Sequence, residues 1–237
     1  MVLLSPSIRG LMSMLQVWES YNVIHGLKYN VTKSQLVIFK ASTKCYSIVP
    51  DVTLNGARLN MVTRFKYLDH WVTDDLCDNG DIERERRSLA VPANMLARRF
   101  ARCTKQVKIT LFEAYCQSFY TCSLWVDYTR GTYNGLRVQY NNAFRVLLGL
   151  SRFCTASGMF AEAHSNGFAA IIRKRCASML HRLRDSPNRI LSALSAGWDS
   201  PMLAHWMRQH AVVQKLNVVL FLCRRPYVWY NKLTLRA

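Results

Sequence analysis

The pattern of hydrophobic and polar positions begins with an amphipathic helix. Ser5-Pro6 is a helix start, because Ser5 can cap the helix and Pro6 can occupy its first position. Gly26 predicts the end of this helix, which should pack on a sheet. Its apolar positions recur at helical spacing and are Ile8, Leu11, Met12, Leu15 and Trp18.

Short strands are predicted after this helix. Residues 35–39 form an apolar run behind a polar loop, and residues 52–59 read as two strands around Asn55-Gly56, a strong hairpin signal. In residues 64–73, aromatic side chains alternate with polar ones, which predicts one further strand. The turn residues 78–81 are expected to end this α/β part.

From Asp81 onward the pattern is helical. An apolar stripe runs from Ile82 to Phe100, and Pro92 is expected to divide it into two helices. Residues 111–126 are apolar nearly all round and predict a core helix. Helices are also predicted at residues 133–148, which end at Gly149, and at 168–183, with weaker signals at 190–194 and 202–206, whereas residues 218–226 show no period.

These elements predict an α+β fold, with a small partial sheet and one packing helix followed by an all-helical bundle. We expect one domain at residues 1–79, a helical region at 80–206 and a separate tail at 207–237.

The net charge of the chain narrows the classes of binding partner. The chain has 32 Lys and Arg against 14 Asp and Glu, a net charge of +18, which favours nucleic acid as the partner. An anionic membrane surface or an acidic protein would suit the same number. No segment has the length of a membrane span or the pattern of a targeting signal, so we expect an intracellular protein of the nucleus or cytoplasm without a membrane partner.

The spacing of the cysteines and of the carboxylates does not favour a metal-binding site. The eight cysteines form no Cys-x-x-Cys pair, which favours reduced thiols over disulfides or a zinc module. Asp74-Asp75 follows a strand and could pass for a metal-binding pair. A two-metal site needs another converging carboxylate, and Asp51, Asp78 and Asp81 lie in turns or at a helix cap, so we expect a solvated turn and no metal ligand.

The order and spacing of these segments resemble the reverse transcriptase of an insect-type non-long-terminal-repeat retrotransposon. The resemblance covers about residues 1–206 and leaves out the tail. It is carried by the run from Gly26 through Lys33 to Phe39, the Asn-Gly hairpin, Phe65-Lys66-Tyr67-Leu68-Asp69, Trp71-Val72-Thr73-Asp74-Asp75-Leu76 and the basic region opening at Asp81-Ile82-Glu83-Arg84.

The resemblance implies a polymerase palm followed by a helical thumb. In this family an Asp-Asp hairpin and a third aspartate bind two Mg²⁺ ions, and Met1 to Leu4 resembles the strand that directly follows that pair. The implied protein is therefore a fragment that carries no cofactor of its own. It would lack the catalytic aspartates and the fingers, and these would be partners if they are encoded separately.

Two family motifs imply roles for particular residues. Lys33 resembles the lysine that approaches the nucleotide phosphates and helps protonate the pyrophosphate, a role idle in a fragment; the alternative is a solvated loop lysine. Lys66 and Tyr67 lie in the run from Phe65 to Asp69, which resembles the hairpin that grips the primer terminus in the palm. Asp69 replaces the usual glycine there, and its carboxylate would repel a primer phosphate.

The basic helices resemble the thumb surface that tracks a template-primer duplex through its phosphates, with a solvated helix face as the alternative. The residues concerned are Arg84, Arg87, Arg98, Arg99, Arg102, Lys105 and Lys108. Two functions stay open: a fragment of an RNA-directed DNA polymerase that binds template-primer without polymerising alone, or a non-catalytic module for RNA-DNA hybrid or structured RNA. A helical adaptor with a basic surface is a third class.

Overall fold

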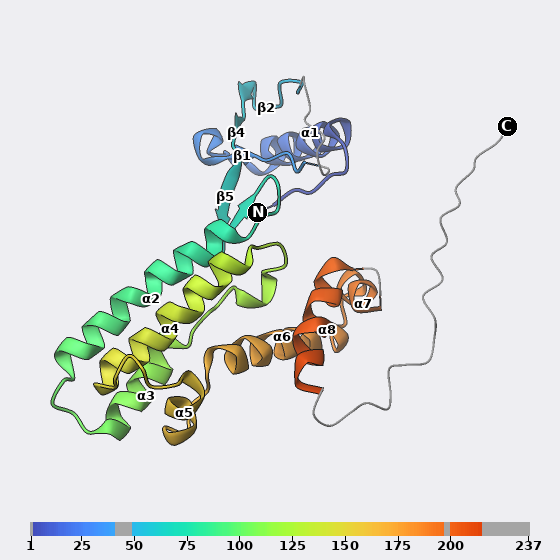
Figure 1. Cartoon of the computed structure of the whole chain (residues 1–237). Helices are drawn as coiled ribbons and strands as arrows, with labels where there is room; N and C mark the ends of the chain where they lie inside the picture. The colour runs from blue at the N-terminus through green and yellow to red at the C-terminus, as the bar shows by residue number, and fades with distance from the viewer. Residues whose placement is uncertain (1, 41–48, 197–199, 215–237) are drawn as a thin grey trace, which may run out of the picture. The chain divides into compact units, whose positions relative to one another are not determined.

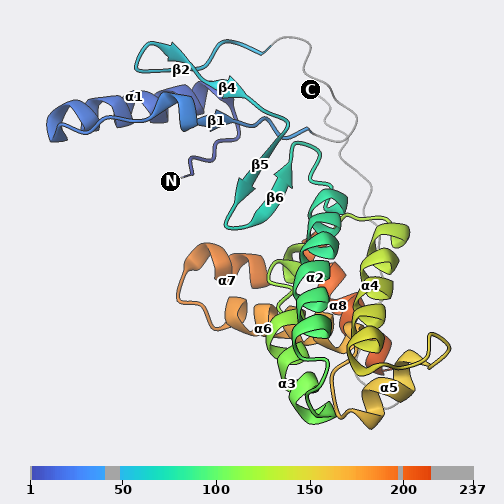
Figure 2. The same cartoon turned by 90° about the vertical axis from the view of Figure 1, so that its left-hand side faces the viewer.

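The computed structural model describes residues 2–40, 49–196 and 200–214, and the chain forms two compact units, Met1–Phe168 and Ala169–Ala237 (Figures 1 and 2). The predicted α+β class is confirmed. In the first unit the elements are α1 (Ile8–His25), β1 (Gln35–Leu36), β2 (Thr53–Leu54), β3 (Ala57–Arg58), β4 (Asn60–Met61), β5 (Arg64–Tyr67), β6 (His70–Thr73), α2 (Asn79–Arg99), α3 (Lys105–Cys116), α4 (Arg130–Leu148) and α5 (Ala156–Glu162), with 3-10 turns at Val31–Lys33 and Cys122–Leu124. Helices α6 (Phe168–Arg184), α7 (Arg189–Ala196) and α8 (Pro201–Gln214) follow.

Helix α1 begins two residues later than Ser5-Pro6 predicts. The cap is Ser7, whose Oγ accepts a hydrogen bond from the Gly10 N–H at 3.1 Å, while Ser5 bonds Ser7 instead. Ser7 is extended, as a cap must be, so it can present its oxygen to the first turn. Gly26 ends the helix in the left-handed conformation, as predicted.

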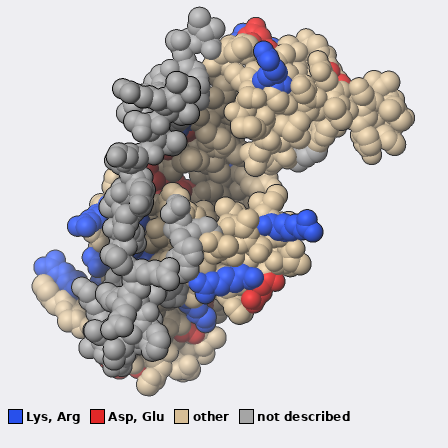
Figure 3. Space-filling view, turned by 90° about the vertical axis from the view of Figure 1, so that its right-hand side faces the viewer, with Lys and Arg blue, Asp and Glu red and all other residues tan. Residues whose placement is uncertain are grey.

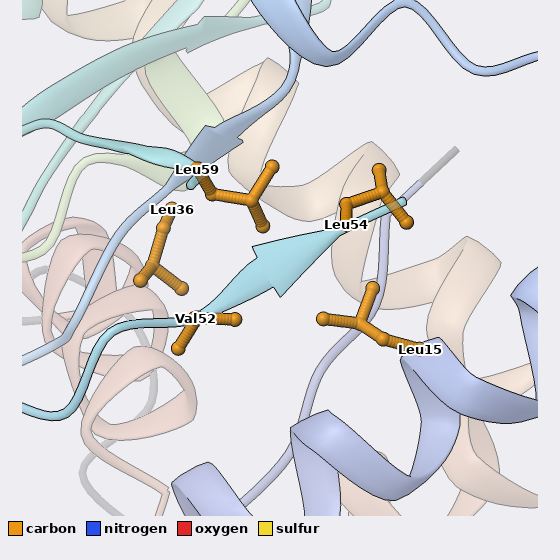
Figure 4. Close-up of a cluster of buried hydrophobic side chains, with 5 residues drawn as sticks. All are labelled: Leu15, Leu36, Val52, Leu54 and Leu59. Carbon is orange, nitrogen blue, oxygen red and sulfur yellow. The ribbon is translucent and has the colours of Figure 1, made fainter. Parts of the chain in front are cut away.

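A small apolar core joins α1 to the strands. Leu15 of α1 and four strand or loop residues point toward one another in Figure 4: Leu36, Val52, Leu54 and Leu59. The predicted packing of the helix on strands is therefore confirmed. The strands themselves are shorter than predicted: β1 keeps only Gln35 and Leu36 and pairs parallel with β4, and Val2 to Leu4 form no strand.

The Asn-Gly hairpin is confirmed, because β2 and β3 pair antiparallel around Asn55-Gly56, both with positive φ. The single strand predicted over residues 64–73 is wrong. It folds into a second hairpin, β5 with β6, and the turn residues Leu68 and Asp69 have φ of 47° and 66°. Two successive positive φ values are the geometry of a tight type I′ turn, which usually selects Asn and Gly and was therefore not evident from Leu-Asp.

Helices α2 and α4 pack side by side, with α3 against them (Figure 1). Ile82, Leu89 and Leu96 of α2 are buried, at the helical spacing the sequence shows. The break predicted at Pro92 is wrong, because α2 continues through it. Proline removes one hydrogen bond, to the Ser88 carbonyl, and burial of the helix on both sides of that point outweighs the loss.

The core helix predicted over residues 111–126 is also wrong in extent. Helix α3 ends at Cys116, and the chain turns through Phe119 at φ 23° into the 3-10 turn. Thr121 and Trp125 in this segment donate hydrogen bonds to a buried carboxylate on α2. These tertiary contacts hold the chain out of the helix that its apolar composition favours.

In the remaining helical part, α4 ends at Gly149 in the left-handed conformation and α6, α7 and α8 lie where helices were predicted. Ile172, Cys176, Leu203 and Trp206 are buried. The unplaced run at residues 218–226 lies outside the described residues. Within the described part, no helix is both long and apolar enough to cross a membrane.

The turn at Asp69 gives a stability prediction. We expect Asp69→Gly to raise the free energy of unfolding by about 0.5–1 kcal/mol, because glycine takes positive φ without steric cost. The lost ion pair between Lys66 and Asp69 (2.6 Å) is exposed and offsets little of this gain. Urea unfolding measures the change, with Asp69→Asn as the matched control that removes the charge but keeps a side chain; a destabilised glycine variant would show that the ion pair holds the turn.

Candidate nucleic-acid interface

The predicted thumb residues gather mainly where α2 passes into α3. Arg98 and Arg99 occupy the last turn of α2, Arg102 lies in the short connection, and Lys105 and Lys108 lie in the first turn of α3. We call these five residues the basic corner. Phe100 ends α2, and the Cys103 N–H bonds its carbonyl at 3.1 Å, so the connection is a tight turn that keeps both helix ends together.

Most of the basic corner has no carboxylate partner. Arg98, Arg99 and Arg102 are exposed and Lys108 is half-buried, and among the described residues none of the four lies within 4.0 Å of an acidic group. Lys105 differs, because it pairs with Glu162 of α5. On the face drawn in Figure 3, basic side chains stand at several places, some of them with acidic side chains beside them.

The N-terminus of α3 adds positive charge to the basic corner. Its cap residue Thr104 is extended, but the Thr104 side chain accepts no capping hydrogen bond, and no acid lies in the first turn. Free N–H groups and the helix dipole at such an end attract anions. Lys105 and Lys108 stand in the same turn, an arrangement unfavourable for the helix alone and suited to a bound phosphate.

Other predicted residues have internal partners or lie apart. Arg87 pairs with Glu83 at 3.0 Å, and Lys66 pairs with Asp69. Arg84 bonds Asp81 and Glu85, so its guanidinium is committed to the interior. Tyr67, at the end of β5 beside the turn at Leu68-Asp69, is 48% exposed. Lys33 is exposed in the 3-10 turn, where its N–H bonds the Asn30 side chain at 3.1 Å.

The buried hydrogen-bond network around Asp81 is the main feature that the sequence did not predict, because the sequence placed Asp81 only in a turn or at a helix cap. Its carboxylate is fully buried and accepts five hydrogen bonds. The donors are His70 Nδ1 (3.0 Å), the Trp71 backbone N–H (3.1 Å), Arg84 Nε (2.9 Å), Thr121 Oγ1 (2.8 Å) and Trp125 Nε1 (2.8 Å). An ionised carboxylate only accepts, so His70 carries its hydrogen on Nδ1.

These donors set the charge state of Asp81. Burial alone would raise the pKa of the carboxyl, but the hydrogen bonds from His70, Arg84 and Trp125 outweigh burial and hold the pKa well below its usual range. Asp78 and Glu85 nearby behave in the opposite way, because burial raises the pKa of each. Asp81 is therefore the firmly ionised member of this acidic group.

Asp74 and Asp75 do not fit the two Mg²⁺ ions of the resembled family. The Asp74 carboxylate pairs with Lys40 at 2.7 Å, and Asp75 Oδ1 accepts from the Cys77 N–H at 3.1 Å. The described residues contain no group of three or more His, Cys, Asp and Glu placed to hold a metal. The expected solvated turn describes Asp75, which is exposed, but not Asp74, whose side chain is 13% exposed.

Among the described residues, no two cysteines are joined by a disulfide, and Cys45 and Cys223 lie outside these residues. Burial raises the pKa of Cys116 to about 12 and that of Cys176 to about 11. A thiol with so high a pKa carries almost no thiolate at neutral pH, so these two residues act as packing groups.

The Asp81 network predicts a pH-dependent stability. Asp81→Asn should lower the free energy of unfolding by about 3 kcal/mol at neutral pH, because an amide leaves Arg84 and other buried donors unpaired. The folded pKa of Asp81 lies below its ordinary 3.8, so its contribution is present above that value and is lost as the pH falls below it.

Urea unfolding at neutral pH and at about pH 3 checks this prediction. The difference in the free energy of unfolding between wild type and Asp81→Asn should be smaller at the acidic pH. Asp127→Asn, at an exposed aspartate, is the control and should change little at either pH. A difference of the same size at both pH values would contradict the ionised buried carboxylate.

In comparisons with known proteins, no family model, no curated protein and no solved structure matches the chain. The resemblance to reverse transcriptases therefore depends only on the order and spacing of the sequence segments quoted above. The geometry of the basic corner is the observation from which function can be argued.

Proposed function

We propose that this protein binds the phosphate backbone of nucleic acid through its basic corner, without reading base sequence. The observation that carries the proposal is a set of four cations at the junction of two helices, for which the described residues supply no carboxylate partner: Arg98, Arg99, Arg102 and Lys108. Backbone binding of this kind gives affinity that falls steeply with salt.

The chemistry of the corner suits phosphate better than a carboxylate partner protein. Three of the four cations are arginines, whose planar guanidinium donates two parallel hydrogen bonds to phosphate oxygens. The uncapped N-terminus of α3 supplies backbone donors beside them. Helix packing fixes both helix ends, so several phosphates along one strand can be contacted without reordering the fold.

Within this proposal, the chain is a piece of an RNA-directed DNA polymerase of the non-long-terminal-repeat type, binding template-primer with a thumb-like helical region and not polymerising alone. Support comes from the resemblance and from the internal use of Asp74 and Asp75, whose carboxylates already pair with Lys40 and the Cys77 N–H. The alternative is a free-standing module for RNA-DNA hybrid or structured RNA, which would use the same basic corner.

The first experiment measures binding of the full chain to an RNA-DNA hybrid duplex by fluorescence anisotropy across a salt series. The variant R98Q/R99Q/R102Q/K108Q should weaken binding and reduce the slope of log affinity against log salt by about 2–4, since each lost phosphate contact changes the slope by about 0.9. The matched control R9Q/K28Q/R130Q/R152Q removes the same charge from exposed positions elsewhere and should change the slope by less than about 1.

Equal losses in the two variants would contradict a localised site and favour attraction by net charge alone. No salt-dependent binding by the wild type would leave the helical adaptor. A Mg²⁺-dependent primer-extension assay on the same sample tests the polymerase part of the proposal, and extension that disappears in Asp74→Ala would overturn the internal role assigned to that carboxylate.

A further inference from the structure

We propose that the second unit carries its own phosphate-binding surface along α6, which binds the backbone of nucleic acid independently of the basic corner. We call it the α6 surface. It goes beyond the proposed function, because it uses different residues in a different compact unit. Its members are Arg173, Lys174, Arg175, Arg182 and Arg184.

The charge of the chain is concentrated in this unit. From Ala169 to Ala237 there are 12 Lys and Arg against 2 Asp and Glu, a net of +10. From Met1 to Phe168 there are 20 against 12, a net of +8 in more than twice the length. Acidic residues balance most of the basic residues in the first unit and almost none in the second.

Helix α6 presents these cations to solvent on a fixed scaffold. Ile172 and Cys176 are buried one turn apart, which sets the inner face of the helix. Lys174, Arg175, Arg182 and Arg184 are exposed and Arg173 is half-buried. From Arg173 to Arg184 the helix rises roughly 16 Å, a length over which a duplex carries roughly ten phosphates.

Within the described part of the second unit, the acid available to neutralise this surface is Asp185, which pairs with His181 at 3.0 Å. Arg182 Nε donates to the carbonyl of Ser178 in its own helix, at 3.4 Å. A balanced solvated helix alternates charges and gains from pairs one turn apart. Among the described residues, none of the five cations has such a pair, so a bound polyanion would relieve the repulsion among them.

Two features favour nucleic acid over an anionic membrane. Four of the five cations are arginines, which suit bidentate phosphate contacts. Membrane-surface helices place an apolar face beside their basic one, whereas the apolar face of α6 is buried. In the described part of the second unit, Ile190 and Leu194 on α7 are exposed apolar side chains that a membrane could use, so vesicle binding is measured as well.

The experiment uses the full chain and the variant K174Q/R175Q/R182Q/R184Q, which changes only exposed side chains. Binding to single-stranded RNA and to an RNA-DNA hybrid is measured over a series of salt concentrations. The same measurements are made on R98Q/R99Q/R102Q/K108Q, on the variant that combines all eight substitutions, and on the control R9Q/K28Q/R130Q/R152Q. We expect the α6 variant to reduce the salt slope by about 2–4 and the losses in the combination to add. Thermal unfolding followed by circular dichroism confirms that each variant is folded.

The outcomes separate the two proposals. If the α6 variant binds like the control, the α6 surface is overturned, whatever the basic corner does. If only the α6 variant loses affinity, the proposed role of the basic corner fails and the present inference stands. If the α6 variant keeps its nucleic-acid affinity but loses binding to phosphatidylserine vesicles, the surface is a membrane contact and the inference is overturned.

Discussion

The Asp81 carboxylate joins three parts of the first unit that are distant in sequence. It lies on α2 and accepts from His70 and Trp71 of the β6 strand and from Thr121 and Trp125 beyond α3. A buried charge without these donors would be costly, so the hairpin, the helix and the 3-10 segment must be in place together. The resulting attachment fixes the strands to the helical part and orients α2, whose far end carries the basic corner.

Carboxylates, more than basic residues, decide where a phosphate can bind in the first unit. Helix α2 has arginines at both ends, but Asp81, Glu83 and Glu85 all lie in its first half. They bond Arg84, Arg86 and Arg87, and the arginine at 84 thereby becomes structural. In the described part of the chain the last turn has no such neighbours, so the guanidinium groups of Arg98 and Arg99 have no carboxylate partner there. The same absence of acids marks α6.

Local signals were reliable where they acted through backbone geometry. Gly26, Gly149 and Asn55-Gly56 were read correctly, because left-handed positions select these residues. The failures have tertiary causes. Packing carries α2 through Pro92, and hydrogen bonds to Asp81 break the helix predicted after Leu111. The turn at Leu68-Asp69 uses residues that rarely adopt positive φ, so only the paired strands reveal it.

The sequence predicted which basic residues belong to the candidate site, but not which of them are available to a partner. That depends on tertiary contacts, as the wrong helix bounds do. A list of basic residues does not say which of them meet a carboxylate, because Arg84 and Arg98 look alike in sequence and differ only in their neighbours. Exposed cations that meet none do not hold the fold together, and their mutual repulsion slightly opposes it. Such exposed cations stand in both units, and a bound polyanion, as proposed above, would relieve the repulsion among them.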